Sequence, residues 1–385
     1  MMVNYLYIED SKEKRIEDFA KQLETNGLKI EIYSLDTADA SEDKFTSLTQ
    51  KIKNFIEGNE LPGILIDYRL DDTRSVDFRA STPAQWVREN FSRLKKDIPI
   101  VLISTDEKIK NLFYKETTGY DLFDRYIKKD DLVEREMATD QSRKLISLAK
   151  GYVEIKKVLK SSSSGLKILK MILKYEKIEE TMDIEAYGYF ISNPKVAPHE
   201  YASFILKELF GFAGYLINEE ILAARLGVDI DSSPDWPKLR DKIFKKAKYE
   251  GVFNVGWNRW WMAEVHNIFE KLTGEYLIEL KAEERVEKLK TKTKLKGLNP
   301  AKPIEDNEST YFWTICKKLK KPLDSLEGFK AKMLRTPKPW QEYDYYSFRA
   351  LIDFGVKKRR EKLHPSEYDR FKEMVRRRKK DGKNK

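Results

Sequence analysis

The stretch 61-LPGILIDYRL-70 decides the fold of the first part of this 385-residue chain. Residues 63–66 are glycine and branched aliphatic residues, and Asp67 ends the run with a carboxylate. A strand of a parallel sheet is covered on both faces, so its sequence is almost continuously apolar. The stretch therefore predicts an inner strand of a parallel sheet, with an acid at its carboxyl end.

Strand-like and helix-like segments alternate on both sides of this strand. Further strands are expected at residues 3–10, 28–35, 98–105 and 121–129, and helices at residues 11–27, 41–58, 82–94 and 107–116. Parallel strands need long crossover connections, and this alternation supplies them. The pattern predicts an α/β domain over residues 1–150, built on a doubly wound five-stranded parallel sheet.

The pattern changes after about residue 150. Four serines and a glycine in 159-LKSSSSGLK-167 indicate a flexible joint, and a Ser-rich linker is expected at residues 151–165. Beyond it, amphipathic segments of helical length are expected at residues 166–182, 199–227, 236–250, 257–273, 309–320 and 341–363, with one strand signal at 275–280. Residues 166–385 are therefore predicted to form a mostly α-helical effector domain with a basic C-terminal segment.

Charge separates the two parts as well. Residues 1–140 hold 22 Lys and Arg against 29 Asp and Glu, whereas the remainder holds 52 against 35, so the nets are −7 and +17. The single cysteine, Cys316, excludes an internal disulfide, and three histidines leave little material for a zinc site. Without a signal-peptide pattern or an apolar run of membrane-spanning length, the chain is expected to be cytoplasmic.

Acidic, hydroxyl and ammonium groups stand at the ends of the expected strands. These residues are Glu9, Asp10, Asp67, Ser104 and Lys128. Ligands of open α/β sheets bind beyond the carboxyl ends of the strands, where these side chains would meet. Carboxylates at one edge repel one another unless a cation lies among them, and oxygen ligands of this kind suit Mg²⁺. The pattern is typical of a site for phosphoryl transfer onto a carboxylate.

Residues 1 to about 150 resemble a response-regulator receiver domain, which has a flavodoxin-like fold. The resemblance rests on 5-YLYIEDS-11, 65-LIDYRL-70, 99-PIVLIST-105 and 126-YIKKDD-131, which occur in the order that the family shows. It implies that Glu9 and Asp10 hold Mg²⁺ and that Asp67 is the phosphoacceptor and a further metal ligand. The carbonyl of Arg69 would complete the metal shell.

The resemblance also implies a switch and a partner. Ser104 would be the switch hydroxyl, Lys128 would pair with the phosphate, and the phosphodonor would be a histidine kinase or a small molecule. The chain departs from the family in three places. Lys129 stands where a proline usually follows the lysine, the loop after Asp67 lacks the usual proline and glycine, and the switch aromatic would fall at Arg125, next to Tyr126.

The basic half suggests an effector that binds DNA or RNA. Clusters in 357-KKRREK-362 and 376-RRRKK-380 would neutralise phosphates, and the candidate contacts are Arg359, Arg360, Arg376, Arg377 and Arg378. Aromatic residues in 254-NVGWNRWWMAEVHNIFE-270 could stack on bases, although tryptophan-rich helices are more often core. The last segment could instead dock as a helix on a protein partner.

Two alternatives stay open beside a phosphorylation-controlled regulator. The first is a degenerate receiver that serves as a non-catalytic interaction subunit. The second is a receiver-gated, metal-dependent nuclease, because Glu279 and Lys281 form a Glu-x-Lys pair at the end of a strand signal. No enzymatic activity is expected beyond phosphorylation of the receiver itself, and the sequence leaves homodimer formation open.

Overall fold

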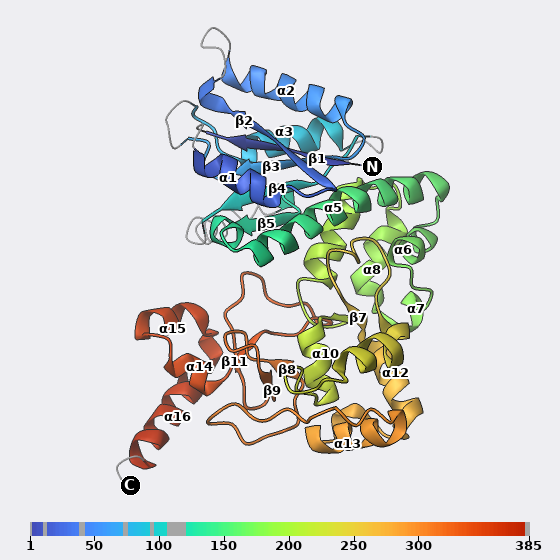
Figure 1. Cartoon of the computed structure of the whole chain (residues 1–385), viewed down its shortest axis with the longest axis vertical. Helices are drawn as coiled ribbons and strands as arrows, with labels where there is room; N and C mark the ends of the chain where they lie inside the picture. Colours follow the sequence, from blue (N-terminus) through green and yellow to red (C-terminus); the bar gives the residue numbers. More distant parts are fainter. Residues whose placement is uncertain are drawn as a thin grey trace. The chain divides into compact units, whose positions relative to one another are not determined.

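The computed structural model describes residues 2–10, 14–37, 43–71, 76–92, 96–105 and 121–381. The chain divides into two compact units. The first contains Met1–Glu208 and Glu250–Trp257, and the second contains Leu209–Tyr249 and Asn258–Lys385. Both are drawn in Figure 1. The helix expected at residues 107–116 lies outside the described residues.

The first unit is built on a five-stranded sheet in which all paired strands are parallel. The strands are β1 (Val3–Glu9), β2 (Leu28–Ser34), β3 (Pro62–Asp67), β4 (Ile100–Ser104) and β5 (Arg125–Lys128). Their order is β2-β1-β3-β4-β5. This confirms the predicted parallel sheet, and the order is consistent with a flavodoxin-like α/β fold. The stretch that ends at Asp67 is the central strand and is buried along its whole length.

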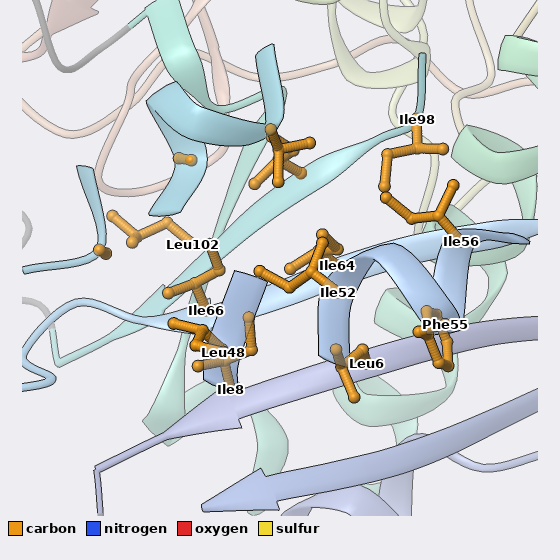
Figure 2. Close-up of a cluster of buried hydrophobic side chains, with 14 of the residues drawn as sticks. Leu6, Ile8, Leu48, Ile52, Phe55, Ile56, Ile64, Ile66, Ile98 and Leu102 are labelled. Atoms are coloured by element: carbon orange, nitrogen blue, oxygen red, sulfur yellow. The ribbon is translucent and has the colours of Figure 1, made fainter. Parts of the chain in front are cut away.

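Helices cover both faces of this sheet (Figure 1). They are α1 (Lys14–Leu23), α2 (Lys44–Gly58), α3 (Ser81–Phe91) and α5 (Arg135–Ser161). Figure 2 shows Leu48, Ile52 and Phe55 of α2 against aliphatic side chains of β1 and β3, in a cluster that also contains residues of α3. On the other face, the Tyr5 hydroxyl of β1 donates to the Leu145 carbonyl of α5 at 2.9 Å. The sheet is thus a buried middle layer, as its apolar strands predicted.

A long helix occupies most of the expected linker. Helix α5 runs for 27 residues to Ser161, so only residues 162–164 separate it from α6 (Gly165–Leu173). The linker prediction at 151–165 misread the serines, because Ser164 caps α6 by accepting a hydrogen bond from the Lys167 N–H. The first unit continues with α7 (Ile178–Thr181), α8 (Ile184–Ser192), α9 (Pro198–Ser203) and a π-helical turn (Phe204–Leu209).

The second unit combines helices with three two-stranded ribbons among its described residues. Its α-helices are α10 (Glu219–Leu226), α11 (Trp236–Lys238), α12 (Met262–Thr273), α13 (Ala282–Thr293), α14 (Phe348–Ile352), α15 (Val356–Lys362) and α16 (Tyr368–Asp381). The ribbons pair β6 (Leu216–Ile217) with β7 (Trp260–Trp261), β8 (Thr314–Ile315) with β9 (Pro322–Leu323), and β10 (Phe329–Lys330) with β11 (Tyr345–Tyr346).

Several segments of the second half differ from the sequence prediction, among them 199–227, which divides into α9, a π-helical turn, β6 and α10. Residues 309–320 form no helix, because β8 turns back through Lys320, at a φ of +56°, to pair with β9. Residues 275–280 form no strand, since Leu277–Glu279 make a 3₁₀ turn before α13. Among the described residues, no helix combines the length and apolarity needed to span a membrane.

Candidate functional site

Three buried acids lie together at the carboxyl edge of the sheet. Glu9 is the last residue of β1, Asp10 follows it, and Asp67 is the last residue of β3. The exposed fractions of these residues are 1%, 6% and 5%, and one oxygen from each lies within 4.8 Å of the others. Since β1 and β3 are parallel neighbours, their ends meet at one edge, where the strand order changes direction.

Electrostatic strain is concentrated in this acid cluster, as we call Glu9, Asp10 and Asp67. Burial, followed by the neighbouring charge of Asp67, raises the pKa of Glu9 to about 9. The Tyr7 hydroxyl donates to Glu9 Oε2 at 2.7 Å and holds that oxygen in place. Three buried carboxylates at such short range need more positive charge to ionise together than the single ammonium of Lys129 supplies. The residues present therefore fit a hard divalent ion such as Mg²⁺, held by oxygen ligands.

Lys129 is the lysine that contacts the acid cluster in this structure, and the phosphate-pairing role predicted for Lys128 stays a prediction. The Lys129 Nζ lies 3.2 Å from Asp67 Oδ1 and 3.5 Å from Glu9 Oε2. Burial alone would lower the pKa of Lys129, but Asp67 and Glu9 raise it. Lys128 is the last residue of β5, and its side chain is exposed. The chain turns into a 3₁₀ helix at Lys129, which directs this side chain to the acids.

The remaining predicted residues lie at the same edge with different surroundings. Ser104 ends β4 and is 1% exposed, and its Oγ has no hydrogen-bond partner among the described residues. A buried hydroxyl in a native structure normally has a partner, which can be water, an ion or a ligand. Arg69 follows β3 by two residues, and its Nε lies 3.6 Å from Asp71 Oδ1. The metal-binding role of the Arg69 carbonyl stays a prediction.

Replacing Glu9 by glutamine is expected to reduce the loss of stability that the metal-free protein shows as pH rises. The pKa of Glu9 is 4.5 ordinarily and about 9 in the folded chain, so the folded state binds more protons between these values. The stabilising effect of this proton is complete below the lower pKa and disappears as pH rises through the higher one. Urea denaturation with EDTA across this range would measure the effect.

Glu60→Gln is the matched control for this comparison, because Glu60 is exposed and lies away from the acid cluster. Its unfolding free energy should follow the wild-type pH dependence. Equal pH dependence for Glu9→Gln and the wild type would contradict the electrostatic description of the cluster.

Sequence reasoning missed a second group of buried charges, at the opposite edge of the sheet. Arg88 of α3 donates to Asp97 Oδ1 at 3.0 Å and to Asp124 Oδ2 at 2.9 Å. The Tyr152 hydroxyl of α5 donates to Asp124 Oδ1 at 2.6 Å, and the backbone N–H of His199 donates to Asp97 Oδ2 at 2.7 Å. These bonds join α3, α5 and α9. No local sequence signal reveals them, because the partners are far apart in the chain.

The predicted nuclease pair is not arranged as a nuclease site. Glu279 ends the 3₁₀ turn Leu277–Glu279, Lys281 precedes α13, and both side chains are exposed. Among the described residues, Glu9, Asp10 and Asp67 form the one group of three or more acidic, histidine or cysteine side chains close enough to share a metal ion. The strand expected to align the Glu-x-Lys pair is not formed, and nuclease activity itself stays a prediction.

The predicted nucleic-acid contacts separate into packing residues and exposed residues. Arg359 donates to the carbonyls of Leu351, Ile352 and Phe354 at the end of α14, and its contact with nucleic acid stays a prediction. Arg378 donates to Asp306 at 3.0 Å. Arg378 is nevertheless exposed, as are Arg360, Arg376 and Arg377.

A scan against models of protein families and a search of curated proteins found no match to this chain. The fold and the geometry of the acid cluster are therefore the basis for assigning a function.

Proposed function

We propose that the first unit is a phosphoacceptor module of the receiver type, in which Asp67 accepts a phosphoryl group from a histidine kinase or a small phosphodonor. The observation that supports this most strongly is the acid cluster with Lys129 at 3.2 Å from Asp67 Oδ1. A carboxylate nucleophile, oxygen ligands for a divalent ion and a cation for the incoming phosphate are the groups that such a transfer needs.

The transfer itself needs little covalent chemistry from the protein. A carboxylate oxygen of Asp67 attacks phosphorus, and the bond from phosphorus to the donor nitrogen or oxygen breaks, with its electron pair leaving on the donor. Mg²⁺ held by Glu9, Asp10 and Asp67 would neutralise charge on the phosphoryl oxygens. The Lys129 ammonium stabilises a second oxygen, and the unsatisfied Ser104 hydroxyl is available to donate to a third.

The register of β5 also favours this proposal. With Lys129 as the lysine of the site, Tyr126 lies three residues before it. The family's switch aromatic then falls on Tyr126 rather than on Arg125, which removes one departure noted from the sequence. Tyr126 is half-buried and packs against the main cluster of the sheet. Moving the assignment by one residue thus improves the agreement with the family at the switch aromatic.

Beryllofluoride, which mimics a carboxylate-bound phosphoryl group, is expected to bind the wild-type chain when Mg²⁺ is present. Asp67→Ala should show no binding, because the nucleophile is absent. Asp77→Ala is the matched control, since Asp77 is an exposed acid in the loop after β3. Fluorine NMR would detect the bound species. Equal behaviour of the wild type and Asp67→Ala would favour a degenerate receiver that acts as an interaction subunit.

A second candidate function, binding of nucleic-acid phosphates, is supported by the surface of α15. None of its residues is buried, and it exposes Lys357, Lys358 and Arg360. The exposed Arg376 and Arg377 of α16 add to this basic segment. Lysine and arginine side chains near a phosphate backbone release counterions, so binding of this kind weakens steeply with salt.

Replacing Lys357, Lys358 and Arg360 by glutamate reverses their charge. This variant is expected to bind labelled DNA and RNA more weakly, whatever the sequence of the nucleic acid. The slope of log affinity against log salt should fall by about one for each phosphate that the variant no longer neutralises. The control variant replaces three exposed α5 lysines, at residues 150, 157 and 160, by glutamate. Its net charge is the same as that of the α15 variant. An unchanged affinity in the α15 variant would rule out this surface and favour a protein partner.

A further inference from the structure

Strand β1 brings a tyrosine next to the acid cluster. Side chains alternate between the two faces of a strand. Leu6 and Ile8 belong to the hydrophobic cluster that β1 shares with α2 (Figure 2). Tyr5, Tyr7 and Glu9 therefore face the other side of the sheet, which α5 covers. Tyr7 is thus the neighbour of Glu9 along this face.

The Tyr7 ring is fixed in the protein interior. Its exposed fraction is 0%, and its hydroxyl donates to Glu9 Oε2 at 2.7 Å. A phenol hydroxyl is protonated near neutral pH, so it donates one hydrogen bond to a carboxylate. The hydroxyl therefore holds one particular oxygen of Glu9 in a set direction.

Glu9 Oε2 has a second donor in Lys129. The Lys129 Nζ donates to the same oxygen at 3.5 Å. A carboxylate oxygen accepts about two hydrogen bonds, one on each lone pair. Tyr7 and Lys129 thus engage both lone pairs of Oε2. Glu9 can then bind an ion through one atom, Oε1.

The number of oxygens that a carboxylate offers separates Mg²⁺ from Ca²⁺. Mg²⁺ requires an octahedron of ligands at about 2.0–2.1 Å, keeps several waters and takes one or two carboxylates. Ca²⁺ takes about six to eight oxygens at longer distances and accepts both oxygens of one carboxylate. A Glu9 that is confined to one oxygen suits Mg²⁺ and reduces the number of ligands for Ca²⁺.

A second observation, independent of the acids, indicates a ligand at this edge. Ile103 of β4 pairs with Asp67 of β3, and Ser104 follows it as the last residue of β4. Ser104 is 1% exposed, and its Oγ has no hydrogen-bond partner among the described residues. Buried hydroxyls normally have a partner. An ion with its shell of water would supply one.

We propose that Tyr7 is a positioning residue that makes the acid cluster select Mg²⁺ over Ca²⁺, by confining Glu9 to one metal-binding oxygen. The inference rests on the part of the proposed function in which Glu9, Asp10 and Asp67 hold a divalent ion. Tyr7 does not touch the ion and acts through Glu9. Partners that orient metal ligands in this way contribute strongly to metal affinity.

Isothermal titration calorimetry of the full chain with Mg²⁺ and with Ca²⁺ tests this role. The wild type should bind Mg²⁺ more tightly. Tyr7→Phe is expected to weaken Mg²⁺ binding about tenfold, because Glu9 loses the hydrogen bond that orients it. Ca²⁺ should bind at least as tightly as it binds the wild type, since Oε2 regains a lone pair. An unchanged ratio of the two dissociation constants would overturn the proposal, even if both ions bind more weakly.

Tyr5→Phe is the matched control. Tyr5 lies two residues before Tyr7 on the same face of β1, is 0% exposed, and donates to the Leu145 carbonyl at 2.9 Å. This variant removes a buried hydroxyl from the same strand without removing a contact of the acid cluster. Both dissociation constants should stay at their wild-type values. A loss of selectivity equal to that of Tyr7→Phe would show that general loosening of β1 is the cause, and the proposal would fail.

The dependence of Asp67 labelling on Mg²⁺ provides a second readout. With acetyl phosphate as donor, Tyr7→Phe should need about tenfold more Mg²⁺ for half of the maximal rate. The rate at saturating Mg²⁺ should match the wild type, because the hydroxyl is engaged by Glu9 and has no part in the transfer. A lower maximal rate with an unchanged Mg²⁺ requirement would contradict a role in positioning Glu9.

The two measurements separate failure of this inference from failure of the proposed function. If the wild type binds Mg²⁺ and is labelled at Asp67, but binds Ca²⁺ equally tightly, the selectivity is refuted and the proposed function stands. If the wild type selects Mg²⁺ through Tyr7 and is not labelled, the proposed phosphoryl transfer fails alone. If the wild type binds neither ion, both fail.

Discussion

Replacing Lys129 by alanine is expected to slow Mg²⁺-dependent transfer of a phosphoryl group to Asp67 by about 10²–10³-fold. The Lys129 Nζ lies 3.2 Å from Asp67 Oδ1, so it is placed to stabilise negative charge on the incoming group. A preorganised donor of this kind acts on charge that develops during the transfer. Rates of labelling with acetyl phosphate, measured by mass spectrometry at saturating Mg²⁺, would report the change.

Lys128→Ala is the matched control for this prediction. The two lysines are adjacent in sequence, but the Lys128 side chain is exposed at the end of β5. Its removal should leave the labelling rate within about twofold of the wild type, since one exposed charge contributes little. The reverse result, with Lys128→Ala slow and Lys129→Ala normal, would show that the sequence assignment was right and the assignment from the structure wrong.

Replacing Arg88 by methionine is expected to lower the free energy of unfolding of the first unit by about 3–5 kcal/mol. Arg88 is 7% exposed and donates to Asp97 and Asp124, so its removal leaves two buried carboxylates without their cation. The cost arises mainly from this unpaired charge and less from the missing hydrogen bonds. Urea denaturation monitored by circular dichroism would measure it.

Lys96→Met is the control, because Lys96 pairs with Glu57 where both side chains are about half exposed to solvent. Pairs of this kind contribute little to stability. A small effect in both variants would mean that the Arg88 network is accessible to water, and the account of how α3, α5 and α9 are joined would have to be abandoned.

The sheet could be predicted from the sequence because its strands are marked by local composition. The apolar run that ends at Asp67, together with four similar segments, requires burial on both faces and crossover helices between them. The elements of the second half were predicted less accurately than the sheet. The ribbons of the second half contain only two residues in each strand, too few to show a period, and the strands pair through turns such as the one at Lys320.

The acids of the site were predictable for the same reason, since each stands at the end of a marked strand. The lysine was not. Lys128 and Lys129 are chemically identical neighbours, and the point at which β5 turns into the 3₁₀ helix decides between them. The contacts of residues 250–257 were beyond sequence reasoning as well, because their partners Ser147, Gly151 and Ile172 lie far from them in the chain.

The position of a transferred phosphoryl group tests the central claim most directly. The full chain would be incubated with acetyl phosphate and Mg²⁺, reduced with borohydride to fix the acyl phosphate site, and mapped by peptide mass spectrometry. The account predicts one modified residue, Asp67, with no labelling when EDTA replaces Mg²⁺. Labelling at another residue, or labelling of the wild type and Asp67→Asn to the same extent, would contradict it.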